Sequence, residues 1–129
     1  MRPEVAAFLA LARNDLGTAR AIIQSFPGNA AFHCQQAAEK LVKAVLVREG
    51  IREGIRLHRI GDLAAMLPDE HPWRSELEGL DQFSDAATAY RYPGMNGMLA
   101  DPPEAGVLVS TIDHIETLLI RIEDWLRSP

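Results

Sequence analysis

Apolar residues recur at alternating steps of three and four along three long stretches of the chain. In residues 3–26 they are Val5, Leu9, Ala12, Leu16, Ala19, Ile23 and Phe26. In residues 29–50 they include Cys34, Ala38, Leu41 and Val45, and in residues 103–127 they are Leu108, Ile112, Ile115, Leu119, Ile122 and Leu126. Such spacing keeps each set on one face of a helix, so the pattern predicts three long amphipathic helices.

Two further helices are predicted between the second and the last of these. The shorter covers residues 58–67 with Ile60, Leu63, Ala64 and Leu67 on one side, and the longer covers Trp73–Arg91 with Leu77, Leu80, Ser84 and Ala87. Pro27-Gly28 is expected to end the first helix, Asn29 to cap the second at its N-terminus, and Gly50 to stop it. Residues 91–103 contain three Pro and two Gly, which predicts a loop.

No stretch alternates apolar and polar residues with the period of a strand, so no strands are predicted. The expected fold is therefore all-α, an antiparallel bundle of four long helices plus one short helix. The length of 129 residues suits one domain, and we expect residues 1–129 to form it.

The charge and the cysteine content exclude several classes of protein. With 13 Lys and Arg against 18 Asp and Glu, the net charge of −5 argues against binding duplex DNA. The single cysteine, Cys34, excludes an internal disulfide and a Cys-rich zinc module, and its place on the apolar stripe predicts a core residue. No apolar run reaches the ~20 residues that span a membrane, and no signal peptide is recognised, so the expected location is the cytoplasm.

The common enzymatic and cofactor motifs are missing from the sequence. Its four histidines are scattered, with no pair spaced to hold a metal, so neither a metal nor a cofactor is expected. A polar stripe on the second helix is more informative: His33, Gln36, Lys40 and Lys43 follow one another at steps of 3, 4 and 3. An imidazole, an amide and both lysines of the chain suit a nucleotide's base edge and phosphate. The alternative is an ordinary solvated helix face.

Three segments of the chain closely resemble the HEPN domain family (higher eukaryotes and prokaryotes nucleotide-binding). They are Phe32-His33-Cys34-Gln35-Gln36-Ala37-Ala38-Glu39-Lys40, His58-Arg59-Ile60-Gly61-Asp62-Leu63 and Tyr90-Arg91-Tyr92-Pro93. Ala12-Arg13-Asn14-Asp15-Leu16 and Ala19 also look like the family's first helix. The resemblance implies an all-α bundle that forms a homodimer. It also implies genetic pairing with a minimal nucleotidyltransferase, often in toxin–antitoxin-like modules.

Many proteins of this family are metal-independent ribonucleases, whose signature is an Arg, four to six residues and then a His before the last long helix. Arg91 resembles that arginine, but the positions that the signature allows for the histidine hold Asn96, Gly97 and Met98. The only such spacing elsewhere, Arg52 to His58, lies in the wrong part of the domain. About one such pair is expected by chance in a chain with this many Arg and His residues. The missing histidine therefore favours a module that is not an enzyme.

The candidate ligand site combines the polar stripe with the end of the fourth predicted helix. We expect His33, Gln36 and Lys40 to lie towards Arg91, with Tyr92 or the neighbouring Tyr90 available to stack on a base. The competing interpretation is structural, with Gln36 and Arg91 joining helices through buried hydrogen bonds.

The resulting functional hypothesis is a non-catalytic HEPN module that binds a nucleotide, a minimal nucleotidyltransferase partner, or both. One alternative is a ribonuclease toxin that uses Arg91 with another base, and a second is a helical adaptor without a ligand. A homodimer is expected because Leu118, Trp125 and Phe8 lie on a second apolar line outside the core stripes.

Overall fold

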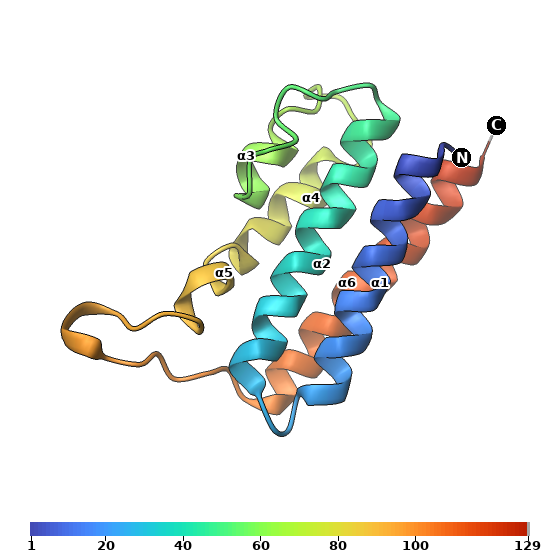
Figure 1. Ribbon diagram of the computed structural model, residues 1–129. Helices are drawn as coiled ribbons and strands as arrows, with labels where there is room; N and C mark the ends of the chain where they lie inside the picture. Colours follow the sequence, from blue (N-terminus) through green and yellow to red (C-terminus); the bar gives the residue numbers. More distant parts are fainter. Residues whose placement is uncertain (129) are drawn as a thin grey trace.

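The computed structural model describes residues 1–128, which fold into helices with no strand in that range (Figure 1). The elements are α1 (Pro3–Ile22), α2 (Pro27–Arg48), α3 (Ile60–Ala64), α4 (Arg74–Gly79), η1 (Leu80–Phe83), α5 (Ala86–Ala89), η2 (Met95–Gly97) and α6 (Ala105–Arg127). The helix α1 runs antiparallel to α2 and α6, and the short elements from α3 to α5 lead back along the other side of α2. The predicted all-α bundle is confirmed.

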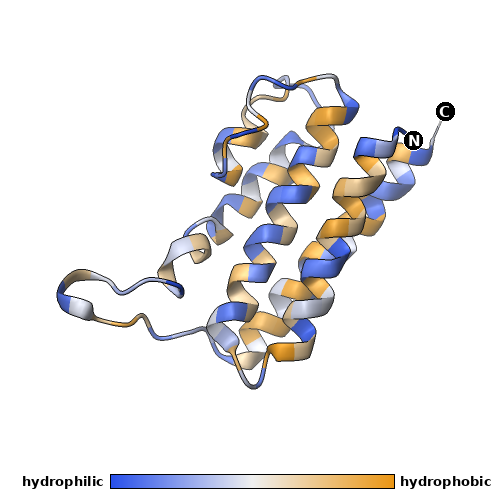
Figure 2. Cartoon of the chain, viewed as in Figure 1, coloured by the Kyte–Doolittle hydropathy of each residue, from blue (hydrophilic) through white to orange (hydrophobic). Residues whose placement is uncertain are grey.

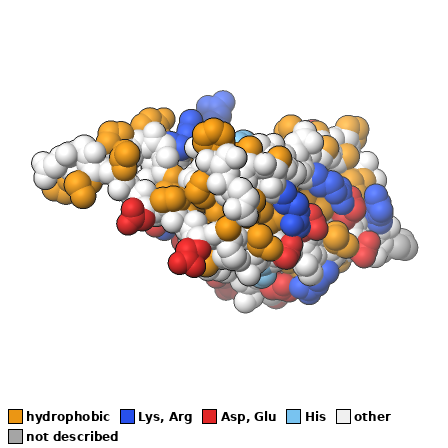
Figure 3. All heavy atoms as spheres, turned by 90° about the horizontal axis from the view of Figure 1, so that it is seen from below, with side chains coloured by type: hydrophobic (Ala, Val, Ile, Leu, Met, Phe, Trp, Pro, Cys, Tyr) orange, Lys and Arg blue, Asp and Glu red, His pale blue; other side chains and the backbone are white. Residues whose placement is uncertain are grey.

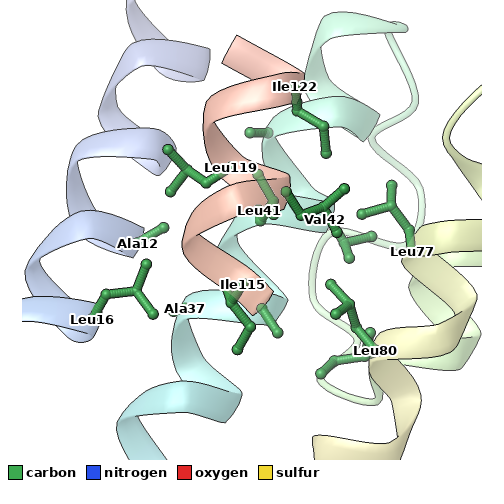
Figure 4. Packing of buried hydrophobic residues seen from close by; sticks show 14 of the residues in the cluster. Ala12, Leu16, Ala37, Leu41, Val42, Leu77, Leu80, Ile115, Leu119 and Ile122 are labelled. Atoms are coloured by element: carbon green, nitrogen blue, oxygen red, sulfur yellow. The ribbon is translucent and has the colours of Figure 1, made fainter. Parts of the chain in front are cut away.

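The helix α2 is the centre of the bundle, because α1 and α6 pack on it from one side and α3, η1 and α5 from the other. Leu41 and Val42 of α2 are fully buried and meet Ile115 of α6 and Leu77 of α4 in one core (Figure 4). Figure 2 shows the corresponding hydropathy pattern, with apolar stripes along each long helix. The predicted core stripes of α1, α2, α3 and α6 are buried, except for Phe26, which is 59% exposed beyond the end of α1.

Two of the predicted boundaries of α2 have different outcomes. The helix begins at Pro27 with Phe26 as its N-cap, so the expectation that Asn29 caps it is wrong. Proline suits the first helical position because its φ is already helical and it has no N–H group to satisfy. At the other end Gly50 has φ 75°, and the N–H of Ile51 donates to the carbonyl of Leu46 at 2.9 Å. This is a Schellman motif, which confirms Gly50 as the stop.

The stretch predicted as one helix over Trp73–Arg91 is divided into α4, η1 and α5. The division coincides with contacts to the start of α3. The Asp81 carboxylate accepts hydrogen bonds from the N–H of Gly61 at 2.7 Å and from the Ser84 hydroxyl at 2.9 Å, and Ser84 Oγ accepts from the N–H of Ile60 at 3.0 Å. These bonds satisfy free N–H groups of α3, and they hold residues 81–84 in a 3-10 and turn conformation.

The apolar line that predicted a dimer surface is used inside the chain. Leu118 is 2% exposed and belongs to the core, and Phe8 packs against that core. The Trp125 ring meets the Trp73 ring edge-on, with 6.2 Å between centroids, and the Arg48 guanidinium lies 4.6 Å from the Trp125 ring centre. Leu118, Phe8 and Trp125 therefore pack within one chain, and they are not the free apolar surface from which a homodimer is predicted.

Residues 91–104, called the arm below, project from the bundle between α5 and α6 (Figure 1). At its tip Asn96 and Gly97 both have positive φ, and the N–H of Gly94 donates to the carbonyl of Met98 at 2.7 Å, which closes a tight turn. Met95, Met98 and Leu99 are 86%, 69% and 78% exposed, and Figure 3 shows apolar side chains along the arm. Among residues 1–128, no helix has the length and apolar character needed to cross a bilayer.

Candidate functional site

Two residues of the predicted polar stripe meet on one carboxylate of the neighbouring helix. Asp15 of α1 accepts from the Lys40 ammonium at 2.5 Å through Oδ2, and its Oδ1 lies 2.8 Å from His33 Nδ1. Asp15 is 8% exposed, whereas the His33 and Lys40 side chains keep 28% and 23% of their surface. A buried carboxylate needs such partners, so this cluster also joins α1 to α2.

The other two residues of that stripe take different places. Gln36 donates to Gln35 Oε1 on its own helix at 2.7 Å. Lys43 is 7% exposed and pairs with Glu39 at 3.3 Å, and Gln35 donates to the same carboxylate at 3.3 Å. Lys43 is therefore part of a buried polar cluster on another side of α2, away from the Asp15 cluster.

Arg91 is held by aromatic rings. Its guanidinium carbon lies 4.2 Å from the Phe32 ring centre and 5.6 Å from the Tyr92 ring centre. Such stacking fixes the position of the side chain and leaves its five N–H donors available. Within residues 1–128 Arg91 makes no ion pair, and it is exposed. The structural alternative of buried cross-links through Gln36 and Arg91 therefore does not fit the observed contacts.

Arg91 and Tyr92 line a pocket at the base of the arm with a volume of about 360 Å³. Its walls come from the turn between α1 and α2, from the end of α5, and from the part of the arm that returns to the bundle, at Leu99, Ala100 and Pro102. Gly28, in the first turn of α2, faces Tyr90 so closely that an added Cβ would lie 3.0 Å from the Tyr90 Cβ. Glycine thus allows the tyrosine to pack against the helix start and shape one wall.

The structure divides the predicted site into two parts that meet at Phe32. Arg91 and Tyr92 line the pocket, while His33 and Lys40 contact the Asp15 carboxylate. The Phe32 and His33 rings meet edge-on with 5.3 Å between their centres, and the Arg91 guanidinium stacks on the same Phe32 ring. Sequence reasoning missed Asp15 and Phe32 as parts of the site, although both stand in segments that carry the family resemblance.

The remaining candidates for chemistry are separated or inert. Arg52 forms a two-bond ion pair with Glu4, whereas the His58 ring lies 3.4 Å from Glu39, so these two do not form a catalytic pair. Burial raises the pKa of the Cys34 thiol to about 11, which keeps it protonated at neutral pH. Across residues 1–128, no group of three or more His, Cys, Asp or Glu gathers as a metal site would require.

Comparison with known proteins identifies the family. The sequence model of the HEPN domain matches residues 5–123, which is nearly the whole chain. No curated protein and no solved structure matches this chain. The match includes both halves of the candidate site, from Asp15 on α1 to Arg91 at the base of the arm. On this match, the chain belongs to the HEPN domain family.

Proposed function

We propose that this HEPN protein is a non-catalytic module that binds a nucleotide in the pocket at the base of the arm. The observation that carries the proposal is that Arg91 has no carboxylate partner. Most Lys and Arg side chains pair with carboxylates, whereas Arg2, Arg56 and Arg91 have no such partner within residues 1–128. Of these three, Arg91 lines the pocket.

The pocket has the chemistry that a nucleotide requires. The Tyr92 ring offers an apolar face to a base, and the Arg91 guanidinium offers paired N–H donors to a phosphate. A volume of about 360 Å³ falls in the range typical of small-molecule sites. A single exposed arginine in a pocket is compatible with the net charge of −5, because a local cationic site depends on neighbouring groups and not on the total.

We infer that the chain works as a homodimer and with a minimal nucleotidyltransferase, in a toxin–antitoxin-like pair. The support is the arm, whose Met95, Met98 and Leu99 are exposed to an extent that is costly for a chain that stays alone in water. Methionine is well suited to such a contact because its flexible side chain adapts to a partner surface.

One observation favours a second function, a metal-independent ribonuclease. Asp15 holds His33 Nδ1 at 2.8 Å, which orients the imidazole in the way that a carboxylate orients a general base. Arg91 would then steady the phosphate, and His33 would take the place of the histidine that the arm lacks. The third reading, a helical adaptor without a ligand, predicts that no nucleotide binds.

Calorimetric titration with AMP, ATP and GTP tests the proposal, with Arg91→Ala as the test variant. Arg56→Ala is the matched control, since Arg56 is also exposed and unpaired within residues 1–128 but lies in the loop between α2 and α3. We expect binding that Arg91→Ala weakens at least tenfold and Arg56→Ala leaves unchanged, with similar melting curves for all three proteins. Absence of binding, together with a large fall in the melting temperature of Arg91→Ala, would assign Arg91 a structural role.

A further inference from the structure

The tautomer of His33 follows from its contact with Asp15. A carboxylate can only accept hydrogen bonds, so at a distance of 2.8 Å His33 Nδ1 carries the hydrogen. The opposite nitrogen, Nε2, points away from Asp15 and carries the free lone pair in this tautomer. Because 28% of the side-chain surface is exposed, a ligand from solvent can reach this ring.

His33 lies one helical turn from the pocket. Asn29 is a lining residue, and Phe32 and His33 follow it three and four positions later, which places all three on one face of α2. A turn of helix is about 5.4 Å long, comparable with the size of a phosphate group with its hydrogen bonds. Arg91 lies over the same Phe32 ring that meets His33, so guanidinium and imidazole flank one aromatic ring.

The charges around His33 set what can bind there. The charged groups that face it are Asp15 from α1, Lys40 from α2 and, across Phe32, Arg91 from the arm. Asp15 and Lys40 balance each other, which leaves the single positive charge of Arg91. A proton added to His33 brings a second positive charge beside the pocket, and a bound anion with two negative charges would compensate both.

We propose that the nucleotide carries a terminal phosphate monoester, and that its binding takes up one proton at His33 Nε2. This inference rests on the proposed function, since it assigns the ligand class of the same pocket. The proton comes from solvent and forms an N–H bond that donates to a phosphate oxygen, while Arg91 donates to the others. A phosphodiester carries one negative charge, which Arg91 alone balances, so a diester binds without the proton.

Titration calorimetry of AMP in two buffers that differ in ionisation enthalpy measures the proton directly. At about pH 7.5 AMP is already almost fully dianionic, because the second pKa of a phosphate monoester is about 6, whereas an ordinary histidine is mostly neutral. The proteins are the native chain, His33→Gln, and His114→Gln as the matched control, since His114 is an exposed histidine on α6. Cyclic AMP serves as the diester.

We expect uptake of about one proton per AMP in the native chain and in His114→Gln, and almost none in His33→Gln or with cyclic AMP. The AMP affinity of the native chain should also fall by up to about tenfold per pH unit above this pH, and that of His33→Gln should not. AMP binding without proton uptake, or with equal uptake in His33→Gln, overturns this inference and leaves the proposed function standing. If neither AMP nor cyclic AMP binds at any pH, both fail.

Discussion

The guanidinium carbon of Arg91 lies 4.2 Å from the centre of the Phe32 ring, and this contact joins the base of the arm to the outer face of α2. It explains why an exposed arginine, in a segment with little regular structure, has a defined position beside a pocket. Cation–π contacts at exposed sites contribute about 0.5–1 kcal/mol, enough to orient a side chain but little of the stability of the fold. Arg91 can therefore be replaced to test binding without a large effect on folding.

We predict negligible ribonuclease activity. The arm supplies Arg91 but no histidine at the positions of the family signature, and general acid–base catalysis typically contributes 10²–10⁴ in rate. Single-stranded and structured RNA should remain intact on a denaturing gel after incubation with the purified protein. Cleavage that disappears in both Arg91→Ala and His33→Ala would instead establish the ribonuclease function.

We predict that the chain forms a homodimer through the arm. Light scattering after gel filtration should give about twice the chain mass of 14.2 kDa. Replacement of Met95, Met98 and Leu99 by serine together should give monomers, because it removes the apolar surface that the arm exposes. A native chain that is monomeric at tens of micromolar contradicts the dimer, and a triple variant that remains dimeric places the interface elsewhere.

Asp81→Ala should destabilise the protein by about 1–3 kcal/mol, because the N–H of Gly61 and the Ser84 hydroxyl lose their acceptor. The control is Asp85→Ala, since Asp85 is an exposed carboxylate that shares Arg59 with Asp81, and its loss should cost little. Urea unfolding at neutral pH measures both changes. Equal effects of the two variants would show that the bond to Gly61 adds no stability.

The same carboxylate predicts a dependence of stability on pH. Burial tends to raise the pKa of Asp81, but the hydrogen bonds from Gly61 and Ser84 and the charge of Arg59 together lower it below its ordinary value. The folded state therefore holds the charged form more strongly than the unfolded state does. Its contribution is complete above the ordinary carboxylate range and is lost as the pH falls through the lowered pKa. The stability difference between native chain and Asp81→Ala should shrink accordingly in acid.

Leu118→Ala should cost about 2–5 kcal/mol, because Leu118 is 2% exposed and its truncation leaves a cavity in the core. Leu11→Ala is the control, as Leu11 on α1 is 46% exposed. Thermal or urea unfolding compares them. A small effect of Leu118→Ala on unfolding, together with loss of the dimer, would show instead that Leu118 lies at a dimer interface, as the sequence pattern predicts.

The long helices could be predicted because their apolar spacing is a local property. Leu9 and Leu16 on α1, and Ile112 and Leu119 on α6, are buried as their steps of three and four indicate. The same reasoning wrongly places Leu118 at a dimer surface, because it expects one apolar stripe to form the whole buried face of α6. In the bundle α6 packs against both α1 and α2, so a wider arc of its surface is covered.

Features that depend on residues distant in sequence could not be predicted from spacing. The break in the helix expected over Trp73–Arg91 depends on bonds from Asp81 and Ser84 to a segment about 20 residues earlier. Asp15 is one of two acidic residues on α1, with Glu4, and only the fold brings it to His33 and Lys40. The two halves of the candidate site were each visible in the sequence, but their meeting point, Phe32, was not.

The most direct test of nucleotide binding at the arm is an amide ¹H–¹⁵N NMR titration of the labelled full chain with AMP. We predict shift changes that are centred on the pocket walls, at residues 25–29, 89–93, 99, 100 and 102, and that extend to His33. At the same AMP concentration they should be much smaller in Arg91→Ala. Shift changes centred on another face, such as that of α1 and α6 around Arg20 and Ile120, would contradict the site. Spectra that AMP leaves unchanged would contradict the binding function itself.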